Sequence, residues 1–369
     1  MTASSTPARA TVANAPWSSS VLVSRPAWVD PPRRQRHHEV AEDVAHDLVA
    51  GHAPVEVSVV SPGTPLPRPP DLSVVIAVRN DLERLVDCLA ALASATQDQV
   101  VQVVVVDGGS TDRTTSTLLI DFPYVTLVRT ATDLGPAWST DIGLSRCQAP
   151  VMLLCDPGAR PTPEALAALR RHLVAHPRCA LAAAPLDDEA GRPLPGPAPR
   201  PTLRHLLVEE SGLARLWPDN PWRRRLPLHA LGGVVDGTPP LGLLALRRAA
   251  LDEVGPLDTD LPWHEHYLDW VRRLAKSGWE TRVIDGPRVT QVTVGGYGTD
   301  DGWRRHRDRI RYARKHHGAW GVRCASVSLW SWALVEAGAR IAGRGAPLER
   351  GIFGAFEALG RARHVRAMA

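Results

Sequence analysis

The sequence has too few suitably spaced cysteines for a disulfide framework or a zinc ribbon. Five cysteines occur in 369 residues, and none belongs to a Cys-x-x-Cys pair. An odd number of isolated cysteines is typical of a reducing compartment, so we expect a cytoplasmic protein.

Long apolar runs are also missing. Nowhere do eighteen apolar residues follow one another without a charge, and the N-terminus has no basic segment followed by an apolar stretch. We therefore expect neither a membrane span nor a secretory signal. The protein is expected in the cytoplasm, with the inner face of the membrane as the alternative location.

Lysine is almost absent: of the 43 basic residues only Lys276 and Lys315 are lysines, and the formal net charge is +4. No basic stretch alternates with aromatic residues, although arginines cluster at 223–225 and 304–314. Solvated protein faces explain such clusters, so we expect no nucleic-acid partner.

Apolar residues, by contrast, are sufficient for one sizeable core, at 44% of the chain. The proline-dense segment 62–71 predicts a stiff linker, because each proline fixes its own φ and restricts the preceding residue. We place the main domain boundary there. Residues 1–70 are expected to form a partly disordered extension with a short helix at 37–50, residues 71–302 the main domain, and residues 303–369 an amphipathic helical tail.

Strand and helix patterns alternate in the main domain. A buried-strand pattern at 72–78 precedes an amphipathic segment at 82–92 and a Val-rich strand at 100–107, and the alternation continues through 125–156. This order predicts an α/β fold with a mostly parallel central sheet and helices on both faces. Ligands of such sheets bind beyond the carboxyl ends of the strands.

The segment VVVVDGGSTDRT at 103–114 ends a buried strand in an acid followed by Gly-Gly-Ser-Thr-Asp, and it resembles the family 2 glycosyltransferases. VVIAVRND at 74–81, Asp-Leu-Gly at 133–135 and the stretch 241–291 extend the resemblance, which is closest to the rhamnosyltransferase-like branch. The resemblance implies the Rossmann-like A-type glycosyltransferase fold and a nucleotide-sugar donor. The implied donor-binding positions are Ala77, Arg79, Asp107, Gly108, Ser110, Asp141 and Asp156.

The sequence departs from the family at its metal-binding turn. Family members hold a divalent metal on an Asp-x-Asp-like turn, whereas this chain has Asp156-Pro-Gly158, and Gln291 stands where a metal-binding histidine is frequent. A single carboxylate, Asp156, makes at best a weak Mg²⁺ or Mn²⁺ site. We expect no firmly held cofactor, and arginines such as Arg79 or Arg160 to meet the diphosphate charge.

The catalytic base is the second departure. Aligning Asp269 with the family's last acid puts Tyr267 at the base position, and a tyrosine with a pKa of about 10 is a poor base. Glu265 or His266 could serve instead, so the catalytic candidates are Glu265, His266 and Asp269. His264-x-His266 lacks a third convincing ligand, and zinc is not expected there.

Two functions follow from the resemblance and its departures. The leading one is sugar transfer from a nucleotide-sugar donor to a hydroxyl acceptor on a glycan, a lipid-linked saccharide or a small molecule. The alternative is a catalytically degenerate domain that binds nucleotide-sugar as an accessory subunit. The helical tail is expected to pack on the core, with peripheral membrane contact as the other explanation for its amphipathic pattern.

Overall fold

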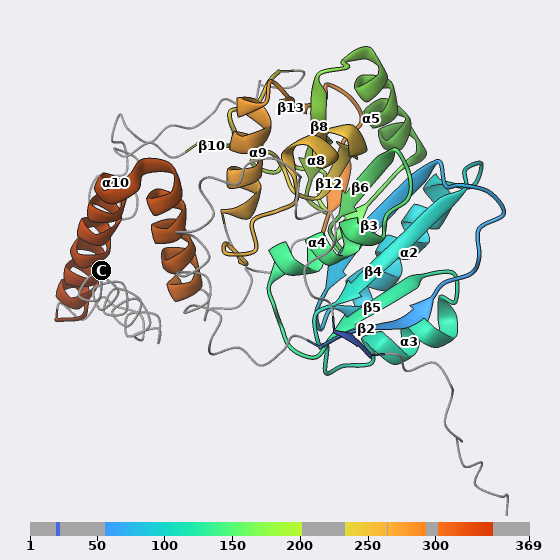
Figure 1. The fold of residues 1–369 in the computed structure, drawn as a ribbon, viewed down its shortest axis with the longest axis horizontal. Coiled ribbons are helices and arrows are strands. Elements are labelled where there is room, and N and C mark those ends of the chain that lie inside the picture. The colour runs from blue at the N-terminus through green and yellow to red at the C-terminus, as the bar shows by residue number, and fades with distance from the viewer. Residues whose placement is uncertain (1–19, 23–55, 201–232, 264, 293–301, 342–369) are drawn as a thin grey trace, which may run out of the picture.

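The computed structural model describes residues 20–22, 56–200, 233–263, 265–292 and 302–341 (Figure 1). The expected helix at 37–50, His264 and residues 342–369 of the expected tail lie outside the described residues. The fold class is confirmed as α/β, with one large sheet between two layers of helices.

The central sheet has nine strands in the order β1-β2-β5-β4-β3-β6-β12-β8-β13. Strands β3, β4, β5 and β6 are mutually parallel, while β12 runs antiparallel to both of its neighbours β6 and β8. The strands are β1 (Ser20–Leu22), β2 (Glu56–Pro62), β3 (Leu72–Val78), β4 (Val101–Asp107), β5 (Thr126–Thr130), β6 (Val151–Cys155), β8 (Cys179–Ala183), β12 (Leu243–Arg247) and β13 (Glu280–Val283).

Helices cover both faces of this sheet. One face packs α2 (Leu82–Ala95), α3 (Thr114–Asp121) and α5 (Pro163–Ala175), and the other packs α4 (Pro136–Arg146), α8 (Arg248–Val254) and α9 (His266–Lys276). The central strands are buried on both sides, which explains why they read as continuous apolar runs rather than alternating ones.

Two small sheets lie beside the main one. β7 (Ala159–Arg160), β14 (Val289–Gln291) and β9 (Leu186–Asp187) form one, and β10 (Ala198–Pro199) pairs with β11 (Gly237–Thr238) in the other. The first of them matters for function, because pairing of β14 with β7 brings Gln291 opposite Ala159, just after the turn that follows β6.

The sheet begins before the proline-rich linker, although residues 1–70 were expected to lie outside the main domain. Strand β2 pairs antiparallel with β5 from Val57 opposite Thr130 to Pro62 opposite Thr126. The prolines that suggested a boundary instead carry the chain from β2 to the start of β3 at Leu72.

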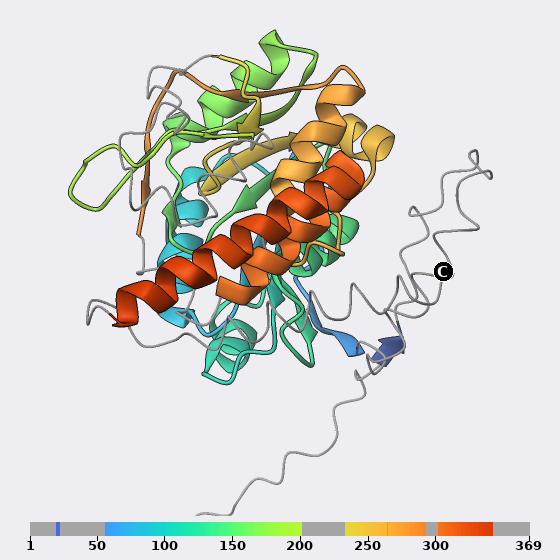
Figure 2. The same ribbon diagram turned by 90° about the vertical axis from the view of Figure 1, so that its left-hand side faces the viewer.

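Helix α10 (Gly302–Ile341) is interrupted at Gly318, whose φ of 60° lies in the left-handed region. The helix therefore doubles back as two arms, the first of which lies beside α9 (Figures 1 and 2). Tyr312 and Ala313 of the first arm are fully buried, so packing of this part of the tail on the core is confirmed. Among the described residues, no helix is both long and apolar enough to cross a membrane.

Candidate donor and acceptor site

The carboxyl ends of three neighbouring strands bring together five of the seven predicted donor-binding residues, all except Asp141 on α4 and Asp156 after β6. In the sheet register Val78 of β3 lies opposite Asp107 of β4, which in turn lies opposite Arg129 of β5. Ala77, partly exposed, precedes Val78, and the loops after these strands carry the remaining polar groups. This is the edge at which open α/β sheets bind ligands.

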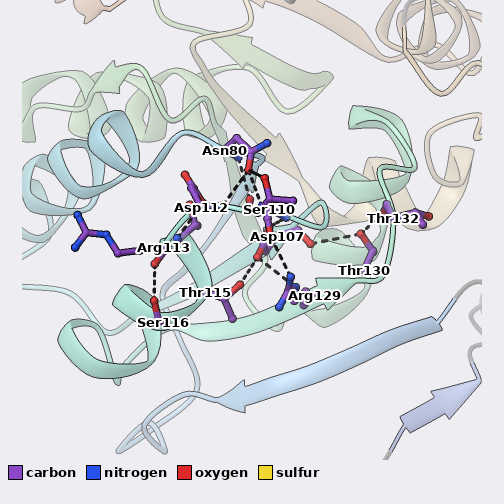
Figure 3. Close-up of polar contacts among 12 residues, drawn as sticks. Asn80, Asp107, Ser110, Asp112, Arg113, Thr115, Ser116, Arg129, Thr130 and Thr132 are labelled. Atoms are coloured by element: carbon purple, nitrogen blue, oxygen red, sulfur yellow. Dashed lines mark hydrogen bonds and ion pairs between the residues drawn. The ribbon is translucent and has the colours of Figure 1, made fainter.

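Asp107 is fully buried and holds the turn that follows β4 (Figure 3). Its Oδ1 accepts a 2.8 Å hydrogen bond from the Ser110 backbone N–H, and its Oδ2 accepts one of 2.6 Å from the Thr115 hydroxyl. The guanidinium of Arg129 lies 3.7 Å from the same Oδ2. Asp107 therefore holds the loop after β4, and its direct contact with the donor stays a prediction.

Asn80 ties this turn to the loop after β3. Its side-chain oxygen accepts a 2.7 Å hydrogen bond from the Thr111 N–H, while its own N–H donates to the Ser110 hydroxyl at 2.9 Å (Figure 3). Asn80 has a positive φ of 49°, a conformation that asparagine tolerates better than most residues. The loops after β3 and β4 are therefore fixed to each other before any donor binds.

Arg79 bridges to the loop after β5 through an ion pair with Asp133. Gly108 lies at this junction: a Cβ on it would be 3.7 Å from the Arg79 Cβ and 3.9 Å from an Asp133 oxygen. Arg79 is 45% exposed, so it remains within reach of a ligand despite its partner.

The donor side contacts the second half of the domain at the start of α4. The Ala137 N–H donates a 3.0 Å hydrogen bond to the Pro262 carbonyl oxygen, and a Cβ on Gly135 would lie only 2.5 Å from that oxygen. The segment leading into α9, which carries the predicted base residues, therefore packs directly on the turn before α4.

The turn after β6 brings Asp156, Gly158 and Gln291 into one group, as their alignment suggested. The Oδ1 of the half-buried Asp156 accepts hydrogen bonds of 2.8 Å from the Gly158 N–H and 2.7 Å from the Gln291 side-chain amide. Gln291 is buried, and its side-chain oxygen has no hydrogen-bond partner among the described residues.

This group does not fit a divalent metal. A Cβ at Gly158 would lie 2.3 Å from the Val292 carbonyl oxygen and 2.7 Å from the Gln291 amide nitrogen, so there is no room for a second acid. One Asp156 oxygen is already engaged by that amide. Mg²⁺ and Mn²⁺ need several oxygen ligands. The described residues contain no group of three or more His, Cys, Asp or Glu side chains able to hold a metal ion.

Arg160, expected to meet the diphosphate, points elsewhere. Its guanidinium pairs with Asp87 of α2 at 2.9 Å and donates to the carbonyl oxygens of Arg84, Pro157 and Ala159. This arginine joins the turn after β6 to α2, and its contact with the diphosphate stays a prediction.

Arg84 is the functional candidate that the sequence reasoning missed. It lies in the first turn of α2, pairs with Asp81, and donates a 3.0 Å hydrogen bond to the Val292 carbonyl oxygen. Its Nη1 would be 3.0 Å from a Cβ at Gly158, so a positive charge lies where the family's second acid would project. An arginine in the first turn of the helix that follows β3 was the signal available in the sequence.

Glu265 lies at the start of α9 in a left-handed conformation, with φ 60°. Such a φ is uncommon for a residue with a side chain and is found most often where function requires it. The carboxylate is only 8% exposed and pairs with Arg309 of α10 at 2.8 Å. Glu265 remains a predicted base. To accept a proton from the acceptor hydroxyl, its carboxylate must first leave its ion pair with Arg309 or keep one oxygen free of it.

The other two catalytic candidates are buried in α9. His266 is 5% exposed and lies against the ring of Tyr267, which itself packs beside the core. Asp269 is fully buried, with Arg273 at 2.8 Å, Lys315 at 2.8 Å and His316 at 2.7 Å. Burial alone would raise its pKa, but the hydrogen bond from His316 and the charges of Lys315 and Arg273 hold the pKa well below its usual range.

Asp269 therefore joins α9 to the first arm of α10 and cannot reach an acceptor in this arrangement, which corrects its assignment as catalytic. On the α10 side, His316 packs against Tyr312 and pairs with Asp269.

Asp141 lies on α4 and is 6% exposed, with one carboxyl oxygen lacking a hydrogen-bond partner among the described residues. Burial raises its pKa to about 7, a shift that the charge of Arg273 partly opposes. Asp141 stays a prediction as a donor-binding residue. Trp138, one turn earlier, is half-buried.

Comparison with known proteins agrees with this architecture. A model of the family described as "Glycosyl transferase family 2" matches residues 73–231. The N-acetylglucosaminyl-diphospho-decaprenol L-rhamnosyltransferase of Mycobacterium tuberculosis is 24% identical over an alignment of 273 positions that covers 68% of this chain and 85% of the relative.

Solved structures with some likeness include a mannosyltransferase from Pyrobaculum calidifontis, in complex with GDP-Man and Mn²⁺, at 18% identity and a TM-score of 0.44, covering 89% of this chain and 87% of that one. TarS 1-349 of S. aureus in complex with UDP is 15% identical with a TM-score of 0.43, covering 73% and 72%. These likenesses are too distant to assign chemistry. The family match places a family 2 glycosyltransferase domain at residues 73–231, and the curated relative and the motifs at 74–81 and 103–114 support a glycosyltransferase that uses a nucleotide-sugar donor.

Proposed function

We propose that the protein transfers a sugar from a nucleotide-sugar donor to a hydroxyl group of a lipid-linked saccharide, without a tightly held metal ion. The acceptor class is suggested by the name of the Mycobacterium tuberculosis relative. Because such an acceptor resides in a membrane, the proposal includes work at the inner face of the membrane. A glycan or small-molecule acceptor remains the alternative.

The observation that carries the metal-independent part is the group formed by Asp156, Gly158 and Gln291. The space for a second acid is filled by the Gln291 amide and the Val292 carbonyl, and the guanidinium of Arg84 lies beside it. A departing nucleoside diphosphate needs positive charge as the glycosidic bond breaks. Arginine can supply that charge and two aligned donors without a metal.

The remaining residues have roles that follow from their positions. Arg79 and Arg129 lie at the carboxyl ends of β3 and β5, each about half exposed, and so are available to a donor. Asp107 and Asn80 hold the loops that present these arginines. Glu265 is the proposed base, because it begins α9 where the segment 256–265 meets the donor side through Pro262.

A second function is favoured by one observation. The carboxylate of Glu265 is paired with Arg309, and that of Asp269 is buried and pairs with Arg273, Lys315 and His316. If substrate binding does not displace Arg309, no base is available, and the chain would bind nucleotide-sugar as an accessory domain.

Release of nucleoside diphosphate from UDP-, dTDP- and GDP-sugars, with a panel of acceptors, tests both functions. We expect release in the presence of a chelator, and a loss of about 10²-fold in Arg84→Ala, the size of effect seen when one transition-state donor is removed. Arg68→Ala is the matched control. Arg68 also pairs with an aspartate three residues away, Asp71, but this pair precedes β3 and so lies at the amino-terminal end of that strand. Thermal unfolding would verify that both variants fold.

Each outcome distinguishes the possibilities. Turnover that stops in chelator and returns with Mn²⁺ would show that a metal is required. Donor binding without release across the whole acceptor panel, in the parent protein, would favour the accessory domain. Release that is unchanged in Glu265→Gln would remove Glu265 as the base.

A further inference from the structure

The second arm of α10 presents its large apolar side chains to solvent. Trp320, Val327 and Trp330 are 68%, 59% and 50% exposed, and Arg323 between them is exposed as well. Their spacing of three, four and three residues puts all four on one face of the helix. We name this face the Trp320 face.

The opposite side of the same arm carries small residues and is packed. Gly321, Ala325 and Ser328 are buried, and Ala325 packs with Ala313 of the first arm. A Cβ on Gly321 would lie 2.5 Å from the Ala313 carbonyl oxygen, so the two arms approach closely. An amphipathic helix that packs on a core normally buries its large apolar side chains. This arm instead buries small residues and exposes the tryptophans of the Trp320 face.

Charge distinguishes between the partners that could cover this face. Arg323 is the only charged residue from 319 to 331, and its guanidinium lies 5.2 Å from the centre of the Trp320 ring. The sequence that follows the helix, 342–369, has five arginines against two glutamates and contains two of the three phenylalanines of the chain. Two copies of such a surface would repel each other, whereas an anionic surface would attract it.

We propose that the Trp320 face docks on the surface of an anionic lipid bilayer, with Trp320, Val327 and Trp330 at the boundary between headgroups and acyl chains and Arg323 at the phosphates. Tryptophan is enriched at this boundary, because its ring is apolar and its N–H can remain hydrated. Basic residues beside it add attraction to anionic lipids. The role of this docking rests on the proposed lipid-linked acceptor, whereas the docking surface itself is inferred from the exposed Trp320 face.

The rest of α10 suits this task. The first arm is anchored to α9 through the buried contacts of Asp269 with Lys315 and His316, immediately before the reversal at Gly318. A surface held this rigidly would orient the site relative to the bilayer, rather than merely tether the chain to it.

Co-sedimentation of the full chain with phosphatidylcholine vesicles, with and without phosphatidylglycerol, tests the proposal. We expect binding only when phosphatidylglycerol is present, weakening with salt, and a loss of about tenfold or more when Trp320, Val327 and Trp330 are all changed to Ser. The matched control changes Ile120 and Val174 to Ser, since these side chains are 76% and 75% exposed on other parts of the surface. A second variant, Arg323→Glu, changes only charge and should also weaken binding.

Vesicle binding that is equal in the parent and the triple variant, or absent in the parent, would overturn the proposal. A parent dimer that the triple variant dissociates, measured by light scattering, would instead make the Trp320 face a contact between copies. Nucleoside diphosphate release with a water-soluble acceptor, measured without vesicles, separates this inference from the proposed function. Release without vesicle binding removes only the docking surface, and vesicle binding without release removes only the transferase proposal.

Discussion

Replacing Asp269 by Asn should destabilise the protein strongly, because this buried carboxylate is held by the charges of Arg273 and Lys315 rather than serving catalysis. The side chain is fully buried, with Arg273, Lys315 and His316 all within 2.8 Å. Removing one partner of a buried ion pair costs about 3–5 kcal/mol. Arg273 keeps its hydrogen bonds to the Val254 and Pro256 carbonyl oxygens, so we expect the lower end, about 3 kcal/mol.

Urea unfolding followed by circular dichroism measures this loss, and Asp258→Asn provides the control. Asp258 pairs with the same Lys315, at 2.5 Å, but that lysine is 39% exposed, so the expected loss is below about 1 kcal/mol. Because the folded-state pKa of Asp269 lies below its unfolded value of about 4, its contribution is complete above that pH and is lost as the pH falls further. The difference between parent and Asp269→Asn should therefore be constant near neutral pH and shrink in acid. A variant as stable as the parent at pH 7 that has lost turnover would refute this reasoning and make Asp269 catalytic.

Two other replacements test buried positions near the site. Gly158→Ala should lower the free energy of unfolding by about 2–3 kcal/mol and weaken donor binding, because its methyl group would overlap the Val292 carbonyl oxygen. Gly196→Ala is the control, since the space around a Cβ at Gly196 is open. Equal urea midpoints for the two variants would contradict the geometry at Gly158. Asp141→Asn should stabilise the protein at pH 8 by at most about 4 kcal/mol, since a pKa of about 7 means that ionising this buried acid costs stability as the pH rises from about 4 to 7. This gain in the free energy of unfolding should vanish near pH 4 in urea titrations. A gain that does not depend on pH would show that it does not come from the ionisation of Asp141.

The sequence was informative about the first half of the sheet. The apolar run 72–78 is β3 with the predicted bounds, and the strand predicted at 100–107 differs from β4 by one residue. These strands are buried on both faces, so nearly every residue carries the signal. Strand β2 was obscured by the prolines after it. The antiparallel insertion of β12 between β6 and β8 depends on contacts between residues that are 61 to 96 positions apart in the chain.

The candidate site was predictable as a set of positions but not as a set of contacts. Asp156, Gly158 and Gln291 do meet, as their alignment suggested. The partners of each charge could not be read from spacing, because arginines are abundant and any of them could have faced the donor. Arg84 faces Gly158, whereas Arg160 turns to Asp87 of α2.

The occupied space around Gly158 also bears on how this lineage can change. Restoring the missing acid by a single codon change would drive a side chain into the main chain at Val292, so the first mutational step back toward metal use is harmful in itself. Recovery would need β14 to move and Gln291 to change first, before either alteration offered any benefit. Under the metal-independent function proposed above, the departure from an Asp-x-Asp turn is therefore difficult to reverse, and a designer who wants manganese dependence should rebuild the strand before adding the carboxylate.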